Sequence, residues 1–194
     1  LKLFDITDPT TPAYLADFTA GGGEAENVAV SGTTAYLSDS TGLWIVDVTD
    51  PFSPTPLGTY GTQKFEGLAV AGDLVFVSGN GFQVVVLDVS DPANPIELGT
   101  VDMPNRVRNI VVDGTRVFVA CDEAGLQSVD VSDPTNPVPL DGVLTSQAAL
   151  DLGMNAGHVF VAASAFMDAV DVYCPIFGDG FESGDTSGWS SAVP

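Results

Sequence analysis

The strongest constraint on the fold is a seven-residue pattern that recurs at an almost constant interval. Residues 3–9, 45–51, 86–92 and 128–134 share a central Asp, a following Thr or Ser, a second Asp and a closing Pro. A fifth copy at 169–175 carries Cys174 in place of the second Asp. The first aspartates are 42, 41, 42 and 41 residues apart, and they are Asp5, Asp47, Asp88, Asp130 and Asp171. Self-similarity at one period predicts an array of stacked structural units.

Each copy of the pattern lies within a longer repeat that predicts four short strands. An apolar run ends at a two-residue turn signal, which is Ser31-Gly32 in the first repeat. The next run carries one aromatic residue in register, and these residues are Tyr36, Phe76, Phe118 and Phe160. The Asp-containing run and a last strand, such as 55–60, complete the unit. Four strands in about 42 residues, without helical periodicity, predict an all-β chain of four-stranded antiparallel β-propeller blades.

The turn between the third and fourth strands has a physical explanation in its Asp-Pro-x-x-Pro sequence. The Asp side chain can accept a hydrogen bond from the backbone two residues on, and the Pro presets a type I turn. The aspartates of this turn are Asp8, Asp50, Asp91 and Asp133. The second proline removes a ladder donor, so the strand that follows it is expected at the outer edge of the blade.

The expected strands do not divide evenly into blades. The sequence supplies about four first, four second, five third and four fourth strands, and it begins with a third strand. Segments 3–6 and 169–172 would compete for one place if the first and last blades joined. We therefore expect about four blades plus partial strands, arranged as an arc of a larger ring. An open arc would expose an apolar blade face.

The chain is strongly acidic, with 26 Asp and Glu residues, 5 Lys and Arg residues and a formal net charge of −21. This charge repels phosphate, so nucleic acid and anionic membrane surfaces are excluded as expected partners, while cations and basic proteins remain open. An excess of acidic residues is also expected to keep a secreted protein soluble. No uninterrupted apolar run approaches the ~20 residues of a membrane span.

The repeated motif resembles the LVIVD repeats of bacterial and archaeal surface proteins. Residues 44–51 and their copies match the hallmark of the repeat, together with the preceding Val-x-Gly-x-x-Ala/Val-Tyr/Phe pattern. The resemblance covers about residues 1–175. It implies a β-propeller and an extracellular or cell-surface location.

Residues 176–194 form a second region, because they lack the repeat and are rich in Gly, Ser and Asp. They resemble a short C-terminal tail of otherwise unrelated secreted bacterial proteins, which implies sorting or anchoring at the surface. A disordered end is the alternative. The tightest carboxylate cluster lies here and supplies the calcium candidates Asp179, Glu182 and Asp185. Their spacing is not that of an EF-hand loop, and no other cofactor is expected.

The repeated aspartates are expected to be structural, because an active site is usually built once and not five times. An Asp between apolar residues is expected to accept hydrogen bonds from the backbone or from Thr and Ser. Asp39 and the Asp122/Glu123 pair are expected in loops after second strands, facing water. The sequence therefore predicts no catalytic residue among its carboxylates.

The remaining reactive side chains are few. His158 is the only histidine, which excludes a zinc site with several imidazoles, and it is expected at a strand end or in a loop. Cys121 and Cys174 are 53 residues apart, a spacing that matches no zinc or redox motif and leaves a disulfide open. A basic patch is predicted from Arg106, Arg108 and Arg116. We expect these arginines to form salt bridges with neighbouring blades.

These observations favour a non-catalytic extracellular repeat scaffold whose loops bind a protein or a glycan. One alternative is a propeller enzyme, such as a glycan hydrolase or lyase, with its site at the channel mouth. It would require unlike polar side chains that converge there and break the repeat. The other alternative is a calcium-dependent surface protein, which the excess of Asp suggests.

Overall fold

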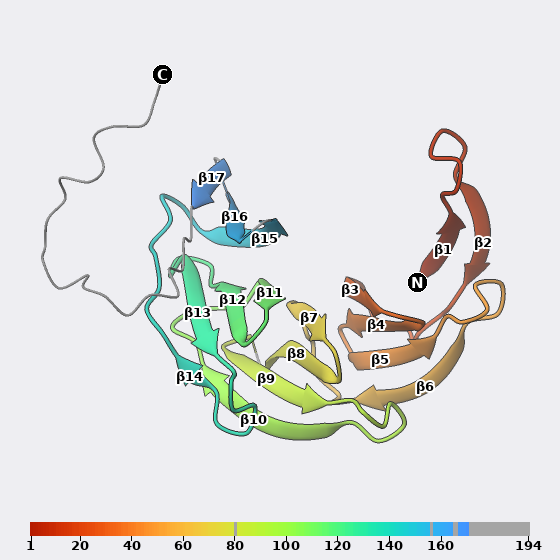
Figure 1. Ribbon diagram of the computed structural model, residues 1–194, viewed down its shortest axis with the longest axis horizontal. Helices are drawn as coiled ribbons and strands as arrows, with labels where there is room; N and C mark the ends of the chain where they lie inside the picture. The colour runs from red at the N-terminus through yellow and green to blue at the C-terminus, as the bar shows by residue number, and fades with distance from the viewer. Residues whose placement is uncertain (80, 156, 165–166, 171–194) are drawn as a thin grey trace, which may run out of the picture.

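The computed structural model describes residues 1–79, 81–155, 157–164 and 167–170. These residues form 17 strands and no helix. The strands make five antiparallel sheets that follow one another in sequence order (Figure 1). In the described part of the chain there is no helix with the length and apolarity needed to span a membrane.

Three central sheets have four strands each, which agrees with the predicted blade. The first contains β3 (Ala25–Ser31), β4 (Thr34–Asp39), β5 (Gly42–Asp47) and β6 (Thr55–Tyr60). The second contains β7 (Leu68–Ala71), β8 (Leu74–Gly79), β9 (Gln83–Asp88) and β10 (Ile96–Asp102). The third contains β11 (Asn109–Asp113), β12 (Arg116–Ala120), β13 (Leu126–Asp130) and β14 (Val138–Pro139).

Two incomplete sheets flank the central three. A two-stranded sheet precedes them, with β1 (Lys2–Asp5) and β2 (Ala13–Asp17). A three-stranded sheet follows, with β15 (Ala149–Asn155), β16 (His158–Ala163) and β17 (Met167–Val170). The expected competition between the first and last third strands does not occur, because β1 pairs with β2 and β17 pairs with β16.

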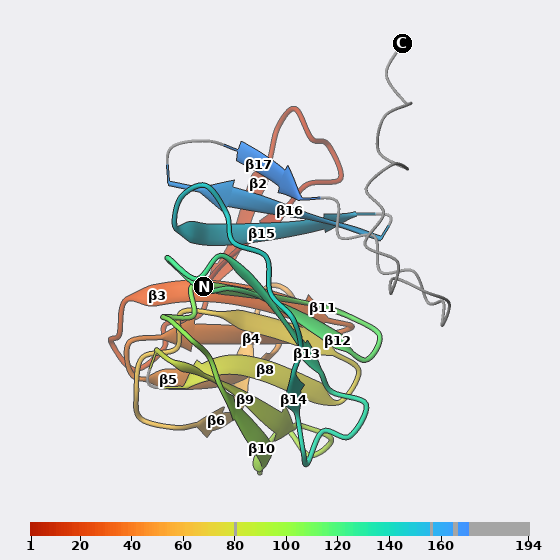
Figure 2. The same cartoon turned by 90° about the vertical axis from the view of Figure 1, so that its left-hand side faces the viewer.

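The sheets are propeller blades fanned around a common axis, and they form an arc that does not close into a ring (Figures 1 and 2). The first strands β3, β7, β11 and β15 lie next to one another in that order. The fourth strands β6, β10 and β14 lie at the outer edge of their sheets, as the proline in each turn predicts.

The hydrophobic core lies between successive blades. Ile45 of β5 packs with Val77 of β8 in one cluster, and Val86 of β9 packs with Val119 of β12 in the next. All four side chains are fully buried. The continuous apolar third strands of the central blades are thereby explained, because a central blade is covered by a neighbour on either side. Apolar surface is left at the last blade, where Phe160 is 43% exposed while the equivalent Phe76 is 1% exposed.

The repeated aspartates organise the turns that link third and fourth strands. The Asp47 carboxylate accepts a hydrogen bond from the Thr49 backbone N–H at 2.8 Å, and Asp50 accepts one from the Phe52 N–H at 3.0 Å. The Ser53 N–H donates to the Asp50 carbonyl at 3.0 Å and closes the turn. Equivalent side-chain bonds occur at Asp5, Asp8, Asp88, Asp91, Asp130 and Asp133. The backbone hydrogen bonds expected of these aspartates are thus formed, whereas Asp171 lies outside the described residues.

Candidate functional site: a charged cavity at the inner ends of the blades

A polar cavity of about 690 Å³ lies where the chain enters the first strands of successive blades. We call it the inner cavity, and it is lined by Glu26, Asn27, Lys64, Glu66, Arg106, Arg108, Asn109, Leu150 and Asp151. The lining comes from four blades, through β3, β11, β15 and the segments that lead into β7 and β11. Residues about 40 positions apart in the sequence therefore face one space.

The lining residues occupy equivalent positions of the repeat but differ in chemistry. In each blade, strand pairing places one residue of the first strand opposite the same position of the second strand. These equivalent first-strand residues are Val28, Leu68, Ile110 and Leu152. Two residues earlier the repeats carry Glu26, Glu66, Arg108 and Leu150. Four residues earlier they carry Glu24, Lys64, Arg106 and Ala148. The fold keeps the position constant while the side chain changes charge from blade to blade.

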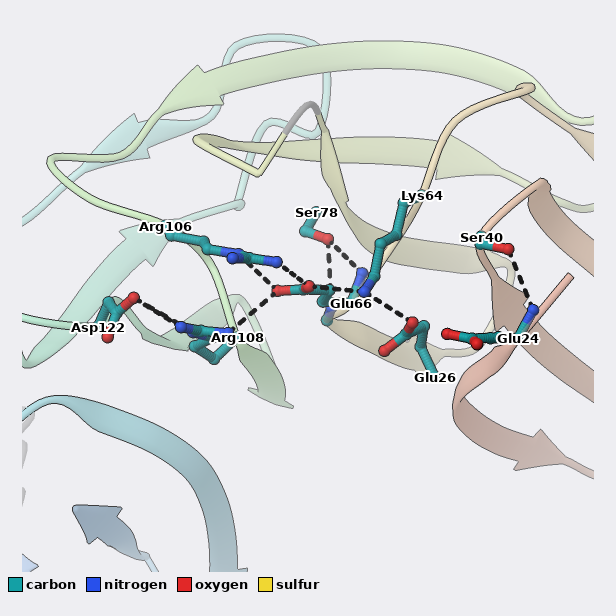
Figure 3. A network of polar contacts seen from close by, with 10 residues as sticks. Glu24, Glu26, Ser40, Lys64, Glu66, Ser78, Arg106, Arg108 and Asp122 are labelled. Atoms are coloured by element: carbon teal, nitrogen blue, oxygen red, sulfur yellow. Dashed lines mark hydrogen bonds and ion pairs between the residues drawn. The ribbon is translucent and has the colours of Figure 1, made fainter. Parts of the chain in front are cut away.

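Glu66 is the centre of the ionic network (Figure 3). Its carboxylate accepts a bidentate pair of hydrogen bonds from Arg106, through Nη2 and, at 2.9 Å, through Nε. Lys64 Nζ lies 3.0 Å from Glu66 Oε1 and 2.8 Å from Glu26 Oε1. Arg108 Nη1 lies 3.7 Å from Glu66 Oε2. One carboxylate with a 12% exposed side chain thus links three basic groups from two blades.

The second partner of Arg108 is Asp122, which extends the network into the turn after β12. Arg108 Nη2 donates to Asp122 Oδ2 at 2.9 Å. Asp122 adopts a left-handed backbone conformation with a φ of 44°, which Asp tolerates better than most residues. Its carbonyl accepts a hydrogen bond from the Ala149 N–H of the next blade at 2.8 Å. The expectation that Asp122 faces water was wrong, because the ion pair holds it against Arg108, while Glu123 is exposed as predicted.

The ionisation of the network is set by mutual pairing. Burial opposes ionisation of Glu66, but the hydrogen bonds from Arg106 and Lys64 outweigh it and keep the pKa of Glu66 below its ordinary value. Hydrogen bonds to Glu26 and Glu66 raise the pKa of Lys64, and the bond to Glu66 raises the pKa of Arg106. All three groups are therefore charged at neutral pH.

The inner cavity gathers three of the five basic residues of the chain. Lys64, Arg106 and Arg108 are balanced by Glu26, Glu66 and Asp122, so the network is close to neutral within an acidic protein. The sequence predicted that Arg106 and Arg108 pair with a neighbouring blade, and Glu66 confirms this. Lys64 and Glu66 were not predicted, although the change of charge from repeat to repeat at each of these two positions was a usable signal.

Other candidates from the sequence lie elsewhere. Arg116 begins β12, at the end of the strand opposite to Arg108, so the predicted basic patch of three arginines does not form. It faces Asp113 and Asp130 across the sheet. His158 begins β16, in agreement with the expected strand end. Cys121 is fully buried, and burial raises the pKa of its thiol to about 12, whereas Cys174 lies outside the described residues.

Asp39 corrects a second expectation of solvent exposure. It ends β4 and is fully buried. Its carboxylate accepts hydrogen bonds from the Thr41 N–H at 2.6 Å, the Thr41 hydroxyl at 2.7 Å and the Trp44 indole N–H at 3.1 Å. Three donors replace water around this carboxylate, which explains how it is buried without a counter-ion.

The described residues contain no group of three or more metal-binding side chains. The calcium candidates Asp179, Glu182 and Asp185 lie outside those residues, as does the whole of 176–194, so their role stays a prediction. The inner cavity offers hydrogen-bond donors and acceptors rather than a cation cage, because each carboxylate of its network is paired with a basic group.

The arc of blades and the variable cavity define a β-propeller repeat protein. Comparison with family models identifies three LVIVD repeats, at residues 22–62, 64–103 and 105–145, which together cover more than half of the chain. The chain therefore belongs to the LVIVD repeat family. The two-stranded and three-stranded sheets extend the same strand order beyond the matched residues. A search of curated proteins gave no match.

Solved structures share the fold at low sequence identity. The computationally designed Ika4 protein matches with a TM-score of 0.66 and 11% identity, over 81% of this chain and 96% of that chain. The β-propeller domain of Cps50 (Swd1) from Myceliophteria thermophila gives 0.60 and 15%, over 80% of this chain and 54% of its own. BamB from Moraxella catarrhalis gives 0.56 and 15%, over 71% and 39%. The chain thus spans about half or less of these two natural proteins.

Proposed function

We propose that the chain is a non-catalytic binding scaffold of the cell surface or the extracellular space, and that its protein or glycan partner binds at the inner cavity. The location follows from the family resemblance. The place of binding follows from the distribution of variable positions in the repeat.

The proposal rests on the contrast between constant and variable positions of the repeat. Positions that the fold needs are the same in the three central blades, as in the turn aspartates Asp50, Asp91 and Asp133. Positions that face the inner cavity change from acid to base to apolar side chain, as in the series Glu66, Arg108 and Leu150. The ion pairs between blades use some of these charges. The change of side chain from blade to blade also gives the cavity the asymmetric surface that recognition of an asymmetric partner requires.

The blades provide the rigidity that a binding site needs. Glu66 is held by the Ser78 hydroxyl, which accepts a hydrogen bond from its backbone N–H at 2.8 Å. Arg108 is tied to β12 through its backbone N–H, which donates to the Ala120 carbonyl at 2.9 Å. Side chains that are already ordered lose little conformational entropy when a partner binds.

The test compares two arginines that lie at opposite ends of one blade. The whole chain is screened against immobilised glycans and extracellular proteins, and each binding partner is titrated again with Arg106→Gln and Arg116→Gln. We expect Arg106→Gln to weaken binding by about tenfold or more and Arg116→Gln to leave it unchanged. Partners that bind both variants equally well would show that the inner cavity is not the site.

A further inference from the structure

Beside the inner cavity lies a smaller hollow of about 280 Å³ that adds an aromatic ring to the same charged surface. Its lining includes Lys64, Glu66 and Arg106, which it shares with the inner cavity, and Phe82, which the inner cavity lacks. The two hollows therefore share one charged wall, and Phe82 lies beside that wall.

Phe82 breaks the repeat. The equivalent position, six residues before the repeated Asp of the third strand, holds Thr41 in the preceding blade and Ala124 in the following blade. Phe82 is 55% exposed, in contrast to the fully buried Phe65 that serves the core nearby. A phenylalanine that replaces a small residue and does not enter the core contributes little to packing. An exposed apolar ring of this kind is typical of a binding surface.

Backbone hydrogen bonds join the segment of Phe82 to the segment of Arg106. The Phe82 carbonyl accepts a hydrogen bond from the Met103 N–H at 2.8 Å, and the Gly81 carbonyl accepts one from the Val107 N–H at 2.7 Å. These two bonds tie the turn between β8 and β9 to the segment that carries Arg106. Phe82 and Arg106 are thus carried on two joined segments and line the same hollow.

The chemistry of this surface matches a sugar ring. A pyranose presents C–H groups on its faces, which pack on an aromatic ring, and hydroxyl groups at its rim, which both donate and accept hydrogen bonds. Lys64 and Arg106 provide donors, and Glu26 and Asp151 provide acceptors. Because the basic groups are already balanced by Glu26, Glu66 and Asp122, no surplus positive charge is left for an anionic ligand.

We propose that Phe82 and the shared wall of the two hollows form a binding site for a neutral, pyranose-containing saccharide. The ring of Phe82 stacks on one sugar, and Arg106 and Lys64 donate hydrogen bonds to its hydroxyl groups. This inference rests on the proposed function and narrows the partner from a protein or glycan to a glycan.

The experiment is calorimetric titration of the whole chain with cellopentaose, xylopentaose, mannopentaose, maltopentaose and chitopentaose, each up to about 10 mM. We expect at least one to bind, and Phe82→Ala to weaken that binding by about tenfold or more. Phe82→Tyr keeps a stacking face and is expected to stay within about threefold of the parent. Phe52→Ala is the matched control, because Phe52 is also exposed but lies in a turn between β5 and β6. Thermal unfolding of each variant checks that it is folded.

Two results would overturn the saccharide site: no heat of binding with any of the five sugars, or a Phe82→Ala variant that binds as tightly as the parent. Either result leaves the proposed function standing if a protein partner is found whose binding is weakened by Arg106→Gln. Both ideas fail together if neither the sugars nor any protein partner responds to Arg106→Gln.

Discussion

The carbonyl oxygen of Pro134 lies 2.9 Å from the place that a Cβ atom on Gly99 would occupy. Gly99 belongs to the outer strand β10 of one blade, and Pro134 belongs to the Asp-Pro turn of the next blade. Gly58 of β6 and the carbonyl of Pro92 repeat the relationship between the preceding two blades. At these two places on the outer rim, carbonyl groups of the next blade, and at Gly99 also the ring of Pro137, fill the space that a side chain would need.

Gly99→Ala is expected to destabilise the protein by about 1–3 kcal/mol, because the added methyl group must push two blades apart. Urea unfolding measures the change. Gly153→Ala in β15 is the control, since nothing lies within 4 Å of a Cβ atom there, and it is expected to change stability by no more than about 0.5 kcal/mol. Equal losses in the two variants would contradict close packing at the rim.

Asp39→Ala is expected to cost about 1–3 kcal/mol of stability, because it leaves the Thr41 and Trp44 donors without their acceptor in a partly buried place. Asp39→Asn keeps one acceptor oxygen and should cost less. The exposed Asp73 serves as the control, and Asp73→Ala should stay within about 0.5 kcal/mol of the parent in urea unfolding. A loss for Asp39→Ala no larger than that of the control would refute the role assigned to this carboxylate.

Glu66→Gln removes the charge that links Lys64, Arg106 and Arg108 (Figure 3). We expect a loss of about 1–3 kcal/mol, because three basic groups then face one another without their common partner. Glu24→Gln is the control, because it also removes one negative charge from an acidic chain. Glu24 lies at the repeat position that is equivalent to Lys64. The prediction fails if Glu66→Gln is as stable as Glu24→Gln.

The turn aspartates predict how stability depends on pH. Hydrogen bonds from Thr and Ser lower the pKa values of Asp47, Asp88 and Asp130. The folded protein then binds fewer protons than the unfolded chain in the acid range. The stabilisation by these ionised aspartates is therefore fully present above their pKa in the unfolded chain, near 4. It is lost as the pH falls through their lower pKa values in the folded protein.

The variant with Asp47, Asp88 and Asp130 all replaced by Asn tests this dependence. Asn keeps an acceptor oxygen but does not titrate, so the fall in unfolding free energy below about pH 4 should become less steep. Urea unfolding from pH 6 to pH 3 gives the slope. Replacement of Asp73, Asp113 and Asp141 by Asn controls for the change in net charge. A slope that is equally steep in both variants would exclude the turn aspartates as its source.

The fold was predictable from the sequence because its signals are local. Each strand is an apolar run, and each connection carries its own turn residues, such as Asp50 with Pro51. Counting these signals predicts four first, four second, five third and four fourth strands, which are the 17 strands of the described residues. The incomplete sheets at the two ends also follow from this count.

The inner cavity was only partly predictable. Arg106 and Arg108 were expected to bind a neighbouring blade, but their partner Glu66 lies 40 residues from Arg106, and only the curvature of the array brings the two together. Asp39 was assigned to the surface because a carboxylate after a strand is usually solvated. The indole N–H of Trp44, five residues later, donates a hydrogen bond to Asp39 and so allows the carboxylate to be buried. A strand pattern does not predict which two side chains will make such a bond.

Within the described residues, the exposed ring of Phe160 marks a blade that has less burial between blades than the interior ones. Burial between blades stabilises the array, and among the described residues the sheet of β15, β16 and β17 packs against one neighbouring blade, that of β11 and β12. The amide hydrogens of β15 and β16 are therefore expected to exchange with solvent ahead of those in β8 and β9, which lie between two hydrophobic clusters. The interior blades act as the most protected cooperative unit.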